Sequence, residues 1–214
     1  MKRSFWKYLW ISLILFAIGV VLGLGEKAGW FQYFNIATVK WASSLRNPHL
    51  NPYFIGVDKF AKTSYDIGVG LTIIVIFSLF KKWKEPLELL FSLIFAGISV
   101  EVLKLAFRVP RPHFSWLVNA SSYSYPSGHS VGAIALYGLL AYMITKTKMP
   151  KSLSYTLSTI LWIFAASILF DRLYVGVHWG MDVIGGAIIG FACLILAVGI
   201  VENMKKAKEV QENK

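Results

Sequence analysis

Cysteine, acidic residues and charge in general are scarce in this chain of 214 residues. Cys193 is the only cysteine, so the chain can build neither a disulfide framework nor a metal site from several cysteines. Charged residues make up 15% and hydrophobic residues 56% of the chain, whereas soluble domains carry about 25% charged residues. The composition therefore disfavours an ordinary soluble domain and indicates a single membrane-embedded domain that covers residues 1–214.

The scarcity of acids leaves a formal net charge of +11, a value that is also typical of nucleic-acid binding proteins. Most lysines and arginines, however, lie in short connections between apolar runs. This placement is typical of membrane topology signals and of contact with lipid headgroups. We therefore expect the bilayer as a partner, no nucleic acid and no obligatory protein partner.

Long apolar runs are abundant, and six of them predict six membrane-spanning helices. Uncharged runs cover residues 8–25, 67–80, 130–145, 152–170 and 183–201, and residues 87–107 form a sixth segment with three charges. A spanning helix needs about 20 apolar residues, and flanking lysines can extend the short runs because their side chains reach the headgroups. The first run has no small-residue cleavage site after it and is interpreted as an uncleaved helix. The predicted fold class is an all-α integral membrane bundle of six transmembrane helices.

Charge placement also predicts the orientation of the bundle. Six spans put both termini on the same side, and the segments on that side hold 13 of the 22 lysines and arginines. Because cytoplasmic segments are enriched in these residues, we predict a multi-pass cell-membrane protein with cytoplasmic termini. The polar clusters described below then lie at the extracytoplasmic face.

The first outer connection, residues 26–66, contains apolar residues at helical spacing. Trp30, Phe34, Trp41 and Leu45 follow one another at intervals of four, seven and four, which places them on one face of a helix. We interpret residues 30–45 as an interfacial helix on the outer leaflet. A packed lid without lipid contact is the alternative.

Three polar clusters fall at the outer ends of the predicted spans, where charges are costly and therefore candidates for function. The first contains Lys104, Arg108 and Arg111, and Pro110 and Pro112 are expected to end the helix so that Arg111 turns back. Cations without nearby acids form a clamp for an oxyanion. An ordinary basic helix end is the alternative interpretation.

The second cluster, Pro126-Ser127-Gly128-His129, opens the predicted fourth span. Proline suits a first helical turn, glycine permits close approach of a ligand, and the free N–H groups of a helix start attract anions. A plain helix start signal with an incidental histidine is the alternative.

The third cluster contains Asp171, Arg172, His178 and Asp182. His178 and Asp182 are four residues apart, so on one helical face the carboxylate can accept the imidazole N–H and fix its tautomer. This arrangement is typical of a catalytic dyad, although a structural hydrogen bond has the same spacing.

Together the clusters resemble the type 2 phosphatidic acid phosphatase family in order and spacing. The matching motifs are Lys-x6-Arg-Pro at residues 104–112, Pro-Ser-Gly-His at 126–129 and Arg-x5-His-x3-Asp at 172–182. The resemblance implies that His178 attacks phosphorus, Asp182 orients it and His129 protonates the leaving oxygen. It also implies that the phosphoryl oxygens are held by Lys104, Arg111, Ser127, Gly128 and Arg172. No metal and no cofactor are expected, because the cations supply the charge stabilisation.

The resemblance predicts a lipid phosphatase that acts on undecaprenyl diphosphate, phosphatidylglycerophosphate or phosphatidic acid. One departure concerns Asp171, where the family usually has serine; the carboxylate can pair with Arg172 or Arg108, or point away. A lipid phosphotransferase with the same phosphohistidine and a non-catalytic lipid-binding protein are alternatives. A soluble vanadium-dependent haloperoxidase would lack six apolar spans, and a transporter or channel would not need Pro-Ser-Gly-His.

Overall fold

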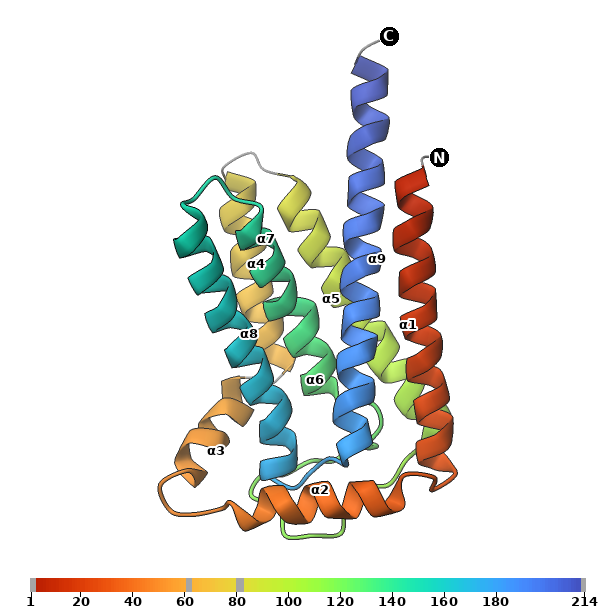
Figure 1. Cartoon of the computed structure of the whole chain (residues 1–214), viewed down its shortest axis with the longest axis vertical. Coiled ribbons are helices and arrows are strands. Elements are labelled where there is room, and N and C mark those ends of the chain that lie inside the picture. The colour runs from red at the N-terminus through yellow and green to blue at the C-terminus, as the bar shows by residue number, and fades with distance from the viewer. Residues whose placement is uncertain (1–2, 61–62, 80–82, 213–214) are drawn as a thin grey trace.

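The computed structural model describes residues 3–60, 63–79 and 83–212, and all regular structure in these ranges is helical. In chain order the helices are α1 (Arg3–Lys27), α2 (Gln32–Ser44), α3 (Asn51–Phe60), α4 (Thr63–Leu79), α5 (Lys84–Phe107), α6 (Gly128–Ala133), the π-helical segment η1 (Ile134–Gly138), α7 (Leu139–Thr145), α8 (Lys151–Tyr174) and α9 (Gly180–Glu212). Figure 1 shows an upright bundle with α2 across one end, while α1 begins and α9 ends at the other. The predicted all-α class is confirmed for these residues.

Five segments of the described chain are long and apolar enough to cross a membrane. They are Phe5–Lys27, Lys84–Phe107, Gly128–Thr145, Lys151–Tyr174 and Gly180–Lys205. The remaining predicted span falls in α4, whose 17 residues rise about 26 Å, against a hydrocarbon core of about 30 Å. The predicted run 67–80 also reaches a residue outside the described ranges, so the count of six stays a prediction.

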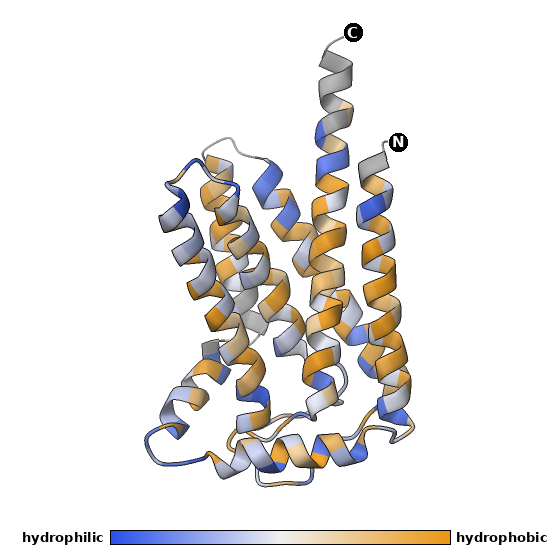
Figure 2. Cartoon of the chain, viewed as in Figure 1, coloured by the Kyte–Doolittle hydropathy of each residue, from blue (hydrophilic) through white to orange (hydrophobic). Residues whose placement is uncertain are grey.

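The upright helices are mostly hydrophobic along their middles and more hydrophilic near their ends (Figure 2). Large apolar side chains such as Trp10 and Ile163 are exposed, at 59% and 64%, which suits contact with lipid better than contact with water. Helices α1 and α9 pack closely where Gly19 faces Ile189. A Cβ at position 19 would lie only 2.6 Å from the Ile189 side chain, so this approach requires glycine.

A central helix, formed by α6, η1 and α7 in succession, holds the core together. Val131, Ala135 and Leu136 on this helix are completely buried. At the π-helical segment, the Ser92 hydroxyl of α5 donates a hydrogen bond to the Ala135 carbonyl at 2.9 Å. A wider turn of this kind leaves a carbonyl available to such a side chain. The central helix, whose first residues include His129, is therefore tied to α5 at its π-helical segment.

The first connection folds into two helices rather than one. The predicted helix 30–45 is present as the shorter α2, and α3 was not predicted. Asn35 fixes α2 because its side-chain amide donates to Glu26 at 2.7 Å and its Oδ1 accepts from the Met181 N–H at 3.0 Å. Arg46 then ties the end of the helix to the Tyr174 carbonyl at 2.7 Å. These bonds place α2 across the end of the bundle that carries the polar clusters.

Candidate active site

The three polar clusters come together at the end of the bundle that α2 covers (Figure 1). They lie at the end of α5 and in the loop after it, at the start of α6, and between the end of α8 and the first turn of α9. Because successive helices of the bundle run in opposite directions, these segments meet although they are up to 78 residues apart in the motif region 104–182. The helices thus bring together the side chains that the sequence motifs predicted.

His178 and Asp182 form the centre of this site. Nδ1 of His178 lies 3.3 Å from Oδ2 of Asp182, and both side chains are buried. The prediction that they share a helical face was wrong, because α9 begins at Gly180 and His178 lies in the bend before it. Asp182 reaches back because its Oδ2 accepts the Trp179 backbone N–H at 2.7 Å, as the third residue of a helix does in a capping box.

Arg111 contacts the other side of the imidazole. Its Nη1 lies 3.1 Å from Nε2 of His178 and donates to the Val177 carbonyl at 2.7 Å. A guanidinium only donates, so Nε2 accepts and the proton of the neutral ring sits on Nδ1, facing Asp182. Burial lowers the pKa of His178 well below its usual value, and the charges of Arg111 and Arg172 add to this effect. The ring is therefore neutral near pH 7.

Lys104 and Arg111 line a cavity of about 510 Å³. The Lys104 ammonium donates to the Ser122 hydroxyl at 2.8 Å, and Nη2 of Arg111 lies 3.3 Å from the same oxygen. Glu101, Leu105 and other residues complete the wall. Burial lowers the pKa of Arg111, which still leaves the guanidinium charged near pH 7. Two cations thus converge on one cavity, and one of them, Arg111, also contacts His178.

Ser127 begins α6 and joins it to α9. Its Oγ accepts the Ser130 N–H at 3.3 Å, and its own N–H donates to the Asp182 carbonyl at 3.1 Å. Pro126 precedes the helix, so its predicted place in the first turn was wrong. On α9, a Cβ at Gly186 would lie 2.8 Å from the Ser127 carbonyl oxygen, which explains why glycine is needed for this close approach.

Arg172 and His129 share an acidic neighbour, Asp58 of α3. Nη2 of Arg172 donates to Oδ1 of Asp58 at 2.8 Å and also contacts the Asp171 carboxylate. The same Oδ1 lies 3.8 Å from Nε2 of His129. Of the possibilities that the sequence left open for Asp171, the structure selects the pair with Arg172, whereas Arg108 donates to a backbone carbonyl.

The sequence pattern of a known superfamily covers this whole constellation. The PAP2 superfamily matches residues 85–206, which is more than half of the chain and includes all three clusters. The chain belongs to the PAP2 superfamily.

Similar proteins agree with this assignment over nearly the full length. The chain is 30% identical over 205 residues to phosphatidylglycerophosphatase B of Bacillus subtilis, covering 93% of this chain and 98% of that one. It is 26% identical over 220 residues to an undecaprenyl-diphosphatase of Sulfolobus acidocaldarius, covering 96% of each. A transmembrane PAP2-type phosphatidylglycerolphosphate phosphatase from Bacillus subtilis has a similar crystal structure, with a TM-score of 0.81 at 28% identity over 90% of this chain and 96% of that one. Aquifex aeolicus LpxE shares the fold, with a TM-score of 0.64 at 24% identity over 77% and 94%. This PAP2 chain is thus a multi-pass membrane protein of a lipid phosphatase family.

Two polar residues of this PAP2 site were missed from the sequence. The Ser124 hydroxyl donates to Oδ2 of Asp182 and lies 3.4 Å from Nδ1 of His178. Ser124 stands two residues before Pro126 in a serine-rich loop, so no signal distinguished it from its neighbours. Asp58 had one signal, a carboxylate within the apolar sequence of α3, but nothing indicated which residues it would meet.

Arg108 does not line the cavity that Lys104 and Arg111 share, although the sequence grouped the three cations together. Helix α5 ends at Phe107, and Arg108 adopts a left-handed conformation with φ of 53°. Its Nε donates to the Leu105 carbonyl at 3.1 Å. The prolines that follow do end the helix, as predicted, and Arg111 turns back toward His178.

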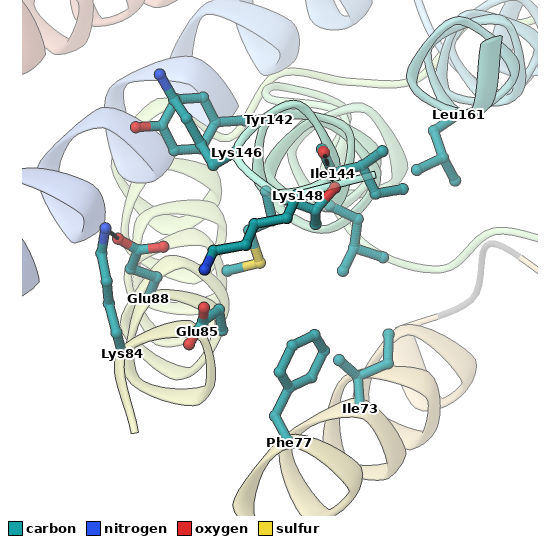
Figure 3. Close-up of a pocket in the computed structure, with 13 residues that line it drawn as sticks. Ile73, Phe77, Lys84, Glu85, Glu88, Tyr142, Ile144, Lys146, Lys148 and Leu161 are labelled. Atoms are coloured by element: carbon teal, nitrogen blue, oxygen red, sulfur yellow. Dashed lines mark hydrogen bonds and ion pairs between the residues drawn. The ribbon is translucent and has the colours of Figure 1, made fainter. Parts of the chain in front are cut away.

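Other features of the described chain do not form part of this site. A cavity of about 700 Å³ near the opposite end of the bundle is lined by apolar residues from α4, α7 and α8 and by the charged residues Lys84, Glu85, Glu88 and Lys148 (Figure 3). It contains none of the motif residues. Within residues 3–60, 63–79 and 83–212 no three histidine, cysteine, aspartate or glutamate side chains are grouped to hold a metal ion.

Proposed function

We propose that this PAP2 protein hydrolyses a lipid phosphate or lipid diphosphate through a phosphohistidine on His178. One observation carries the proposal: the neutral imidazole presents Nε2 to the Arg111 guanidinium, 3.1 Å away, while Nδ1 faces Asp182 at 3.3 Å. A phosphoryl group that enters beside Arg111 replaces the imidazole as the partner of the guanidinium, which frees the Nε2 lone pair for attack and pairs the cation with the phosphoryl oxygens. This arrangement favours nucleophilic attack at phosphorus.

The proposed reaction has two steps. In the first, Nε2 of His178 bonds to phosphorus while the bond to the leaving oxygen breaks, and His129 passes a proton to that oxygen. Asp182 keeps the proton of the attacking ring on Nδ1 and stabilises its positive charge. In the second step, water attacks phosphorus with His129 as base, and phosphate leaves His178.

Cations and hydrogen-bond donors stabilise the charge that develops on the phosphoryl oxygens. We assign this task to Lys104, Arg111, Ser127, Gly128 and Arg172. A Cβ at Gly128 would meet Val100 at 3.5 Å, an ordinary contact, so packing within the chain does not demand glycine there. Close approach of a phosphoryl oxygen to the backbone would demand it. With these groups in place, the reaction needs neither metal nor cofactor.

The substrate candidates are undecaprenyl diphosphate, phosphatidylglycerophosphate and phosphatidic acid. The names of the two curated relatives favour the first two, and a cavity lined by both cations and Leu105 suits a charged headgroup on an apolar tail. A lipid phosphotransferase would use the same phosphohistidine with another acceptor than water. A non-catalytic lipid-binding protein is the remaining alternative.

Phosphate release from these three lipids in detergent is expected to proceed at full rate with excess EDTA. The reason is that side-chain cations occupy the role that Mg²⁺ has in other phosphoryl-transfer sites. Inorganic phosphate would be measured with and without chelator, and with an added alcohol to reveal transfer. Complete loss with EDTA and recovery with Mg²⁺ would refute metal independence, whereas no release from any lipid would refute the phosphatase proposal.

We further propose one domain over residues 1–214 with six spans, α4 being the short one, and with both termini in the cytoplasm. The start of α1 and the end of α9 lie together, as an even number of spans requires (Figure 1). The proposed active site then faces outward, and α2 lies at the outer interface with Trp30 and Trp41 exposed to the lipid.

Orientation is testable with single cysteines at Asn119 and Lys148, both exposed, in a Cys193→Ala background. An impermeant thiol reagent applied to intact cells is expected to label position 119 and to spare position 148 until the cells are opened. Labelling of position 148 alone would invert the proposed topology. Retained phosphatase activity of each variant serves as the control for folding.

Asp171→Ser is expected to leave kcat/KM unchanged or to raise it. The substitution removes the negative charge of Asp171 that contacts Arg172, while Asp58 still accepts a hydrogen bond from the Arg172 guanidinium at 2.8 Å. The measurement is kcat/KM for a lipid phosphate, with the isosteric Asp171→Asn as a matched variant. A loss beyond tenfold, about 1.4 kcal/mol of transition-state stabilisation, would show that this carboxylate supports the reaction.

A further inference from the structure

Asp58 brings the first connection into the candidate site. It lies on α3, far in sequence from the three motifs, and is buried. A single oxygen, Oδ1, lies 2.8 Å from Nη2 of Arg172 and 3.8 Å from Nε2 of His129. One carboxylate thus contacts a proposed phosphate ligand and adjoins the proposed proton donor.

The two contacts differ in kind. The distance to Arg172 is that of a charge-assisted hydrogen bond, which fixes the guanidinium. The distance to His129 is too long for a hydrogen bond but close enough for attraction between charges. Nε2 of His129 is buried and has no hydrogen-bond partner among the described residues. A proton on this nitrogen is therefore available to a leaving oxygen. The carboxylate beside it favours the protonated ring, against the opposing charges of Arg172, Lys104 and Arg111.

Anchoring of α3 does not depend on Asp58. The Phe54 ring stacks on Tyr174 with centroids 4.1 Å apart. The Tyr174 hydroxyl also donates to Oδ1 of Asn51 at 2.8 Å. Since these contacts dock α3 on α8, the burial of a carboxylate at position 58 calls for another explanation.

We propose that Asp58 is a positioning residue for phosphoryl transfer, which fixes Arg172 and stabilises positive charge on His129 when this ring carries the proton for the leaving oxygen. This inference rests on the proposed function. In the step concerned, the bond from His178 Nε2 to phosphorus forms, the bond to the leaving oxygen breaks, and the His129 proton moves to that oxygen. Asp58 itself exchanges no proton and touches no substrate.

Asp58→Asn separates the two contacts. The amide oxygen still accepts from Arg172, but the negative charge beside His129 is gone. The pre-steady-state burst is expected to slow about 10- to 100-fold with a lipid phosphate, whose alkoxide leaves only with a proton. With p-nitrophenyl phosphate, whose leaving group is a stable anion, the burst should change by less than about threefold. Glu26→Gln is the matched control. It also changes a buried acid to an amide, but the Glu26 side chain contacts Asn35, so the ratio of the two burst rates should not change.

Asp58→Ala removes the hydrogen bond to Arg172 as well. The burst with p-nitrophenyl phosphate is then expected to fall too, by about tenfold, because Arg172 is left with Asp171 alone and is less well fixed toward the phosphoryl group. Thermal unfolding in detergent would establish that both variants are folded. Identical behaviour of Asp58→Ala and Asp58→Asn with both substrates would overturn the assigned role toward Arg172.

The decisive measurement is the double variant Asp58→Asn with His129→Ala. If Asp58 acts through His129, Asp58→Asn should no longer change the ratio of the burst rates with the lipid and the aryl phosphate once His129 is alanine. An equal loss on both substrates for Asp58→Asn, or an undiminished effect in the His129→Ala background, would overturn the inference. Absence of lipid phosphatase activity in the unaltered protein would instead refute the proposed function.

Discussion

Replacing His178 by alanine is expected to abolish the phosphoenzyme with every substrate and to lower turnover by at least about 10⁴-fold. His178 is the proposed nucleophile, and alanine offers no nitrogen to bond phosphorus. The loss should not depend on the leaving group, because the first step cannot begin. The measurements are trapping of labelled phosphoenzyme at alkaline pH, where phosphohistidine persists, and the burst of p-nitrophenol from p-nitrophenyl phosphate.

Two comparisons make this result interpretable. His49→Ala removes an exposed histidine of the first connection and should retain full activity. In His178→Ala, Asp182 keeps its hydrogen bonds from Ser124 and the Trp179 N–H, so the variant should remain folded in detergent. A burst that survives in folded His178→Ala would exclude His178 as the nucleophile.

The motif residues could be predicted because each motif is local and its chemistry does not depend on the rest of the fold. Lys104, Arg111 and His178 were predicted from spacing and resemblance. In the structure Arg111 lies 3.1 Å from His178, and both Lys104 and Arg111 contact the Ser122 hydroxyl. The expected local geometry was less accurate. His178 lies before α9 and not on it. The capping contact of Asp182 with the Trp179 N–H marks the start of this helix, at Gly180.

The apolar runs predicted where the membrane-spanning helices lie only when the runs were long. Helix α4 has 17 residues, and its apolar run alone does not fix how much of the bilayer it crosses. Helix α2 is shorter than the aromatic pattern of residues 30–45 suggested, because Trp30 precedes its first turn. Arg46 and Asn35 decide where this helix lies, and both act through contacts far away in sequence.

Asp58 and Ser124 were missed for a different physical reason. Each contributes through a contact across the bundle, with Arg172 in one case and Asp182 in the other. Such partners follow from tertiary packing and leave no periodic signal along the chain. Asp58 also changes the charge of the site, because Arg172 contacts the carboxylates of both Asp58 and Asp171. For the cluster of Lys104, Arg108 and Arg111 the sequence had indicated cations without nearby acids, and the structure corrects this, because Glu101 lines the same cavity as Lys104 and Arg111.

His129→Ala is expected to slow the first step by about 10² to 10⁴-fold with a lipid phosphate and much less with p-nitrophenyl phosphate. A lipid alkoxide is a poor leaving group that requires the proton of His129, whereas p-nitrophenolate departs without one. Steady-state turnover is expected to be slow with both substrates, since water attack on the phosphohistidine uses His129 as base. The pre-steady-state burst therefore has to be measured separately for each substrate.

The site itself provides the controls for this last prediction. His129→Ala leaves Asp58 paired with Arg172 at 2.8 Å, so no buried carboxylate loses its hydrogen bond and the variant should fold. His113→Ala, at an exposed histidine in the loop between α5 and α6, is the matched variant and should leave the lipid-to-aryl ratio unchanged. Equal losses on both substrates in the burst phase would contradict a general-acid role. In that case the imidazole would act by binding the phosphoryl group, because binding is shared by every substrate whereas protonation of the leaving oxygen is not.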